Sequence, residues 1–379
     1  MASRPLLVLA VAYFLAFASG GIQLPLASTA MAGVGMSMGA VGWMWASRSL
    51  MGMLGPLMWG VLSDRRGDAR PYTVAALLSG SVLLVLLSMT TTAPMAILIF
   101  GLYGLMCGPS GSLIDGMVLT ALGDAKHRFG RWRMWGTIGF GVTACGSALL
   151  IDEGLLQPMP HVLFPVCAVL TGLGGISLLF LPKLPRPALA RVRDVWPVLC
   201  RPDMVALFAT STLLWCSHIA YSSFVTPLAM SRGLSESSVG YSLAAAIIVE
   251  ALMLRDSGRF TKRFGARRVL VAVAALTVVR WLLMSVCVDP VLFVVLSGLH
   301  GITFGLFFGT FVQIVAERTP PEMRQATQGA IGSGSFGLGG ALGSLLVGHV
   351  FEATDAHTTW LSMAGVAALA LLVAWRFVR

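Results

Sequence analysis

Long apolar runs separated by short polar connections dominate this chain. Twelve such segments can be delimited, and a helix that crosses a bilayer needs about 20 predominantly apolar residues. The segments cover residues 5–29, 39–63, 71–90, 93–120, 132–151, 160–182, 203–230, 237–257, 268–287, 289–317, 326–351 and 358–378. The pattern therefore predicts an all-α integral membrane protein with twelve transmembrane helices.

The composition excludes a soluble protein. Of the 379 residues, 56% are hydrophobic and only 11% are charged, and the mean hydropathy is +0.84. A soluble domain carries about 25% charged residues, which cover its surface. A cytoplasmic enzyme, a secreted domain and a disordered chain are therefore excluded.

The basic residues lie almost entirely on one side of the predicted spans. Of the 26 Lys and Arg residues, 23 fall at the termini and in the even-numbered connections, whereas Arg232 alone falls in an odd-numbered one. Because positive charge marks the cytoplasmic side, both termini are expected there, in a bacterial inner membrane with the lipid bilayer as a partner. This topology also explains the net charge of +10, so no nucleic-acid partner is expected.

Neither the cysteines nor a glycine-rich segment indicates a cofactor. The six cysteines include no CxxC pair, and no metal site or disulfide is expected from them. Residues 332–337 match G-x-G-x-x-G, but they lie within an apolar span and no strand precedes them. No Walker A loop is present, so ATP is not the expected energy source, and no cofactor is expected.

A polar stretch divides the chain into two related halves. Residues 183–202 are rich in proline and arginine and form a cytoplasmic linker between residues 1–182 and 203–379, each with six spans. The connections after spans 2 and 8 share a pattern, in which Gly60 and Gly67 recur as Gly258 and Gly265, 198 residues later. The first spans of the halves begin at the same offset, which indicates a duplication.

These residues resemble the major facilitator superfamily, whose hallmark is a G-x-L-x-D-R-x-G-x-[RK] connection after span 2. The matching positions are Gly60, Leu62, Asp64, Arg65, Gly67 and Arg70, the last displaced by one residue. The segment FGRWRMWGTIGF at residues 129–140 is similar to a subgroup that includes the phenylpropionate permease, the nucleoside–proton symporters and the lactose permease. The resemblance implies two pseudo-symmetric six-helix bundles and a functional monomer. It also implies alternating exposure of a mid-membrane site between the halves.

The superfamily connection is expected to act in conformational gating. Asp64 and Arg65 can make charge-assisted hydrogen bonds to neighbouring helix ends and so latch one conformation. The resemblance implies that Arg131 and Arg133, at the cytoplasmic start of span 5, also take part in gating. The expected gating residues are Gly60, Asp64, Arg65, Gly67, Arg70, Arg131, Arg133, Gly258, Arg263 and Gly265. The alternative interpretations are positive-inside topology for the connection and an interfacial Arg–Trp anchor for Arg131 and Arg133.

Ionisable residues inside the second half are candidates for proton coupling. Glu250 lies in span 8, and a carboxyl group in low-dielectric surroundings binds a proton more readily near neutral pH. Arg280 in span 9 is a plausible counter-charge that competes with that proton, and His300 in span 10 can relay it. The alternative is a static buried ion pair that fixes helix packing.

Asp115 and Arg48 are the candidates in the first half. Asp115 follows Gly108-Pro109, where a bend in span 4 is predicted, and it is assigned to both proton coupling and substrate binding. Arg48 lies near Trp45, and a cation beside aromatic rings suits an anionic or aromatic substrate. The alternative is that Asp115 pairs with Arg48. The further substrate-binding candidates are Gln23, His218, Tyr221 and Arg280.

The ionisable residues within the spans and the resemblance together favour a proton-coupled secondary transporter. The expected partners are protons and a small solute. The two arginines within the spans favour an aromatic carboxylate, and the resemblance also implies a nucleoside or a sugar. The alternatives are a proton-coupled efflux antiporter and, in another class, a membrane sensor without net transport. An enzyme is not expected, because no HExxH-type site or Ser/His/Asp set is evident.

Overall fold

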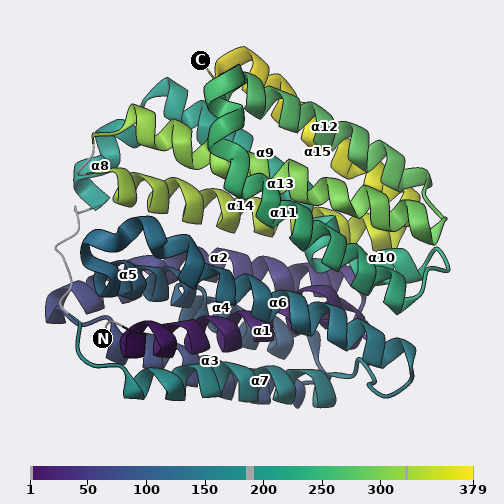
Figure 1. The fold of residues 1–379 in the computed structure, drawn as a ribbon. Helices are drawn as coiled ribbons and strands as arrows, with labels where there is room; N and C mark the ends of the chain where they lie inside the picture. The colour runs from purple at the N-terminus through teal and green to yellow at the C-terminus, as the bar shows by residue number, and fades with distance from the viewer. Residues whose placement is uncertain (1–2, 185–191, 321–322, 379) are drawn as a thin grey trace. The chain divides into compact units, whose positions relative to one another are not determined.

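The computed structural model describes residues 3–184, 192–320 and 323–378, which form helices and no strands. The helices of the first half are α1 (Ser3–Gly33), α2 (Met38–Arg66), α3 (Arg70–Ser88), α4 (Ala93–Cys107), α5 (Ser110–Leu122), α6 (Phe129–Asp152) and α7 (Pro160–Ser177). Those of the second half are α8 (Val192–Leu199), α9 (Pro202–Ser223), α10 (Val225–Met230), α11 (Glu236–Phe264), α12 (Ala266–Val286), α13 (Pro290–Arg318), α14 (Arg324–Ala353) and α15 (Ala356–Phe377). Their order along the chain can be followed in Figure 1.

Eleven helical segments among the described residues are long and apolar enough to cross a membrane. Every predicted span coincides with a helix or a broken helix, but α2 is not one of the eleven, so the expected count of twelve is not confirmed. The bend predicted in span 4 is confirmed, because α4 ends at Cys107 and α5 begins at Ser110. Pro109, between them, has no N–H to continue the helical hydrogen bonds.

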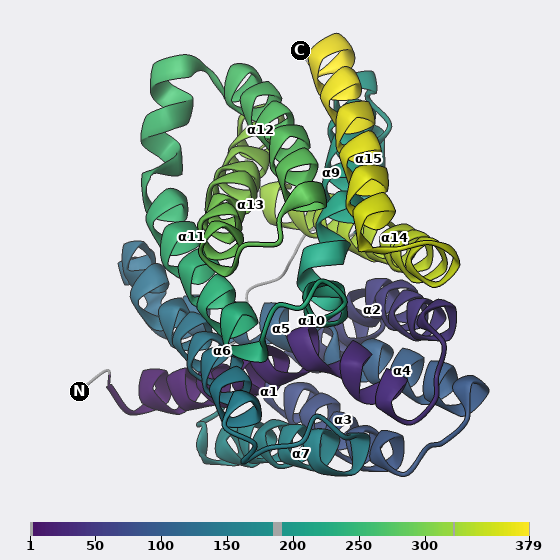
Figure 2. The ribbon, with the colours of Figure 1, turned by 90° about the vertical axis from the view of Figure 1, so that its right-hand side faces the viewer.

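The chain divides into two compact units, Met1–Ala188 and Leu189–Arg379, and the division falls within the expected linker. In the first unit, α2 packs along α4, α1 along α6 and α3 along α7. In the second, α11 packs along α13, α9 along α14 and α12 along α15, as Figure 2 shows for α11 and α13. The same pairing order in both units is what a duplicated six-helix bundle requires.

Glycines allow the closest of these helix pairs to touch backbone to backbone. A Cβ at Gly104 of α4 would lie 2.2 Å from the carbonyl oxygen of Arg48 in α2. A Cβ at Gly301 of α13 would lie 2.3 Å from the amide nitrogen of Glu250 in α11. Small residues at such contacts are typical of membrane helices, where van der Waals packing and not hydrophobic exclusion drives association.

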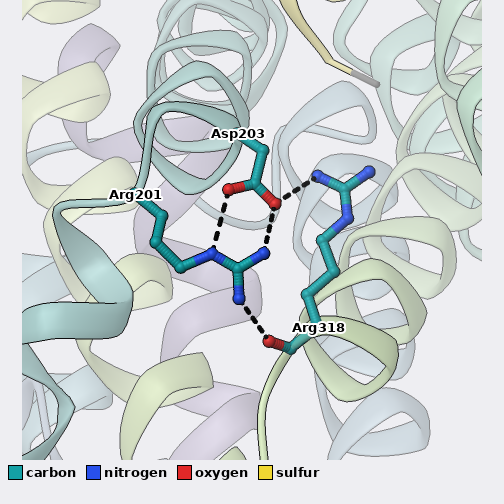
Figure 3. Close-up of polar contacts among 3 residues, drawn as sticks. All are labelled: Arg201, Asp203 and Arg318. Atoms are coloured by element: carbon teal, nitrogen blue, oxygen red, sulfur yellow. Dashed lines mark hydrogen bonds and ion pairs between the residues drawn. The ribbon is translucent and has the colours of Figure 1, made fainter.

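The part of the linker that the structure describes ends in a helix that the sequence did not predict. Helix α8 buries Val195 and exposes Trp196, and it packs against α14. After it, Arg201 donates two hydrogen bonds to Asp203, at 2.9 and 3.2 Å, and one to the carbonyl oxygen of Arg318 at 3.0 Å. Arg318 also contacts Asp203 at 3.4 Å (Figure 3), so the end of the linker is joined to both α9 and α13.

Candidate functional site

Asp115 of α5 lies in a polar cluster built from three helices of the first unit. The hydroxyl of Tyr13 in α1 donates to Asp115 Oδ1, and Arg133 Nε of α6 lies 3.5 Å from the same oxygen. The Arg133 guanidinium also lies 4.2 Å from the ring centroid of Phe17. Tyr13 is fully buried, whereas the side chains of Asp115 and Arg133 keep about a third of their surface exposed (38% and 33%). The cluster therefore leaves a carboxylate and a cation partly accessible.

The hypothesis that Asp115 pairs with Arg48 is wrong. The cation beside Asp115 is Arg133, which was expected at a gate, whereas Arg131 is exposed. Tyr13 was missed, because one tyrosine in an apolar span changes neither the hydropathy nor the helical period.

Arg48 lies on the face of α2 that packs against α4. Its guanidinium carbon is 5.2 Å from the ring centroid of Trp45, 5.5 Å from that of Phe100 and 5.8 Å from that of Tyr103. The predicted proximity of Arg48 and Trp45 is therefore present. The Trp45 indole N–H donates to Ser28 Oγ at 2.9 Å, which fixes that ring.

Gln23 joins α1 to this aromatic group. Its amide nitrogen donates to Ser19 Oγ at 2.7 Å and to the hydroxyl of Tyr103 at 3.1 Å. Ser19 in turn accepts from Thr171 and donates to the carbonyl oxygen of Cys167. The Oε1 atom of Gln23 is buried and has no hydrogen-bond donor among the described residues.

The second unit holds a fully buried arginine, Arg280 of α12. Its Nε donates to the carbonyl oxygen of Leu296 at 3.0 Å, and its Nη1 lies 3.2 Å from His300 Nδ1. The guanidinium also contacts the rings of Tyr221 and Trp281, at 4.5 and 4.1 Å. Its Nη2 is buried without an acceptor among the described residues.

Two histidines and a tyrosine surround that arginine. The rings of His218 and His300 are 5.3 Å apart, and Tyr221 is 4.8 Å from His300. His218 binds the carbonyl oxygen of Leu214 through Nδ1 at 2.7 Å and Thr303 through Nε2 at 3.3 Å. Four of the expected residues are thus brought together: Arg280, His300, His218 and Tyr221.

Glu250 lies partly exposed on α11, where Gly301 and Gly305 of α13 press against its backbone. The ion pairs formed by the described residues do not include one between Arg280 and Glu250. Among the described residues, Arg280 therefore contacts His300 and forms no direct ion pair with Glu250, its expected partner.

Comparison with known proteins places this architecture in a family. The model of the MFS_1 like family matches residues 6–362. The chain belongs to the MFS_1 like family. The expected major facilitator fold is confirmed by its likeness to the crystal structure of the nucleoside transporter NupG, with a TM-score of 0.86, 21% identity and 99% of each chain covered.

Curated relatives of this MFS_1 like protein align over most of their length. The maltose permease of Geobacillus stearothermophilus is 25% identical over 375 residues, which cover 95% of this chain and 92% of the relative. The probable 3-phenylpropionic acid transporter of Escherichia coli K12 is 27% identical over 338 residues, or 86% of each chain. The putative nucleoside transporter YegT of the same organism is 24% identical over 344 residues, which cover 85% of this chain and 79% of the relative.

The repeated connection of the MFS_1 like chain is visible in the backbone. Gly67 follows α2 with a φ of +65°, and Gly265 follows α11 with a φ of +84°. Both angles favour glycine, because a Cβ strains the left-handed region. A Cβ at Gly258 would meet no atom within 4 Å, so Gly258 is not required by packing.

Three of the expected gating residues can be placed only in part. Gly60, Asp64 and Arg65 lie in α2, but their surroundings are outside what the structure describes. Arg70 lies 3.8 Å from Asp68 and donates to the carbonyl oxygen of Leu181 at 2.8 Å. Arg263 lies 5.2 Å from the ring centroid of its neighbour Phe264.

Among the described residues, no group of three His, Cys, Asp or Glu side chains could hold a metal.

Proposed function

We propose that this protein is a secondary active transporter that takes up a small organic solute together with protons. The observation that carries the proposal is the pair of polar clusters inside the spans, one around Asp115 and one around Arg280, in a chain of the MFS_1 like family. Ionisable groups in a membrane interior are costly, and they mark pathways for ions and substrates. Relatives named as permeases and transporters support transport over sensing or enzymatic catalysis.

In the first unit, Asp115 is the residue proposed to bind a proton or to accept a hydrogen bond from a hydroxyl group of the solute. Its carboxylate accepts from Tyr13 and pairs with Arg133. A proton on Asp115 would remove the charge that holds Arg133, and would leave that guanidinium available to the solute. Proton binding and solute binding would in this way affect the same two side chains.

In the second unit, Glu250 is the proposed proton carrier, and the Arg280–His300 contact is the proposed solute-sensitive element. Glu250 keeps exposed surface on α11, as a group that loads and releases protons must. Arg280 is held by His300 and two aromatic rings. The cytoplasmic termini, the inner-membrane location and the functional monomer are parts of the same proposal.

Uptake into proteoliposomes with an imposed pH gradient tests this function. We expect accumulation of 3-phenylpropionate, uridine or maltose only when the outside is more acidic than the lumen. Glu250→Gln should keep solute exchange and lose accumulation, because an amide cannot release a proton. Glu236→Gln, at the start of the same helix, is the matched control and should accumulate like the parent.

Three results would contradict the proposal. Accumulation that is independent of the pH gradient would exclude proton coupling. Solute driven out of the lumen by protons that enter it would instead identify an efflux antiporter, and the absence of any flux for a broad panel would favour a sensor.

A further inference from the structure

Arg48 is a cation of α2 whose guanidinium lies among aromatic rings. Its guanidinium carbon lies within 6 Å of the ring centroids of Trp45, Phe100 and Tyr103, at 5.2, 5.5 and 5.8 Å. The three rings are themselves buried, with exposures of 2%, 0% and 7%. The three buried ring faces therefore stabilise the guanidinium in this position. We call Arg48 and these three rings the arginine cage.

The cage stabilises the charge of Arg48 without satisfying its hydrogen bonds. The Nε atom is buried and has no acceptor among the described residues, and the ion pairs of the described residues do not include Arg48. Each cation–π contact contributes about 0.5–2 kcal/mol, but a ring face does not replace an oxygen acceptor for the planar N–H groups. By contrast, Arg133 in the same unit has a carboxylate at 3.5 Å.

Arg48 nevertheless keeps part of its surface exposed. An arginine that faces lipid in the middle of a span costs about 2.5–3.5 kcal/mol by insertion scales. The exposed part of Arg48 is therefore expected to face a water-filled passage, where a solute can reach it. Buried rings, a buried Nε without an acceptor among the described residues and an accessible charge together describe a group suited to bind an anion.

We propose that Arg48 binds the carboxylate group of the transported solute, so that the substrate class is a small organic carboxylate. This inference rests on the proposed transport function and narrows its three candidate substrate classes to one. The planar guanidinium matches the two oxygens of a carboxylate and forms charge-assisted hydrogen bonds to them. A nucleoside or a sugar has no charge to balance Arg48, and a monoanion balances it fully.

Binding of matched acid and amide pairs tests the proposal directly. The probes are 3-phenylpropionate with 3-phenylpropanamide, benzoate with benzamide, and lactate with lactamide, measured by calorimetry on purified protein in nanodiscs. At least one acid should bind the parent tenfold or more tightly than its amide. Arg48→Gln should weaken that acid at least tenfold and change the amide less than twofold.

Two further variants control for charge and for folding. Arg259→Gln removes an arginine whose side chain is 83% exposed, and it should bind the acid like the parent. Arg48→Lys keeps the charge and loses the planar fork, so its affinity for the acid should fall at least threefold. This variant decides the question if Arg48→Gln does not fold.

The outcomes separate this inference from the transport function. Proton-driven uptake of uridine or maltose with no preference for any acid over its amide would overturn the inference and leave the proposed function standing. An acid preference that survives in Arg48→Gln, or in Arg48→Lys where only that variant folds, would place the carboxylate elsewhere and also overturn it. Arg48-dependent acid binding without proton-driven flux would support the inference and contradict the proposed function.

Discussion

Substitution of Gly301 by alanine should destabilise the second unit, because its Cβ would meet the backbone of α11. A Cβ at Gly301 would lie 2.3 Å from the amide nitrogen of Glu250 and 2.6 Å from the carbonyl oxygen of Ala246, whereas ordinary contact begins at 3.4 Å. Helices α11 and α13 would have to separate locally by roughly 1 Å, which is an overpacking that typically costs about 1–3 kcal/mol. Helix propensity acts in the opposite direction, because alanine is favoured over glycine by about 1 kcal/mol.

Gly298→Ala, one turn earlier on α13, is the matched control. Its Cβ would have its nearest neighbour at 3.9 Å, a side-chain atom of Val249, so only the propensity gain remains. The midpoint of thermal unfolding in detergent, followed by tryptophan fluorescence, should fall for Gly301→Ala and stay or rise for Gly298→Ala. A Gly301→Ala protein as stable as the control would refute the close packing of α11 on α13.

Two further predictions concern carboxylates at helix ends. Asp203→Asn should lower the midpoint of thermal unfolding more than Asp256→Asn. The side chain of Arg318, which pairs with Asp203, is 18% exposed, whereas the arginines paired with Asp256 are 69% and 83% exposed, and exposed ion pairs contribute about 0–1 kcal/mol to stability. Equal shifts of the midpoint in the two variants would contradict this prediction. Asp355 caps α15 by accepting from the Thr358 amide at 2.7 Å, and this hydrogen bond lowers the pKa of the Asp355 carboxyl. The stabilisation by this cap is therefore present at neutral pH and is lost as the pH falls through the pKa of Asp355. The difference in thermal unfolding midpoint between the parent and Asp355→Ala should consequently shrink in acid. A difference that stays constant with pH would argue against the cap.

The positions of the helices could be predicted because each membrane helix needs its own apolar run. The duplication could also be predicted from the sequence. In the structure, α2 and α11 are offset by 198 residues at both ends, from Met38 to Glu236 and from Arg66 to Phe264. The left-handed glycines Gly67 and Gly265 follow from the same repeat. Such features depend on local sequence, which a single chain displays fully.

The partners of the buried charges could not be predicted in the same way. Apolar periodicity is weak in helices that face lipid on one side and protein on the other, so it does not fix their rotation. For this reason the pattern did not predict that Asp115 contacts Arg133 and Tyr13, or that Arg280 contacts His300 and not Glu250. Contacts between helices far apart in sequence are set by tertiary packing, which hydropathy does not encode.

The two units build the same helix contact and place opposite charges on it. Gly104 presses against the backbone of Arg48 in the first unit, and Gly301 presses against the backbone of Ala246 and Glu250 in the second. The offset of 198 residues aligns Arg48 with Ala246, so the second unit has no cation at that position and carries an acid one turn later. A contact that holds the backbone within van der Waals distance fixes these side chains on the helix face. The duplicated fold thus supplies one rigid support, on which the first unit carries the proposed anion-binding cation and the second the proposed proton carrier.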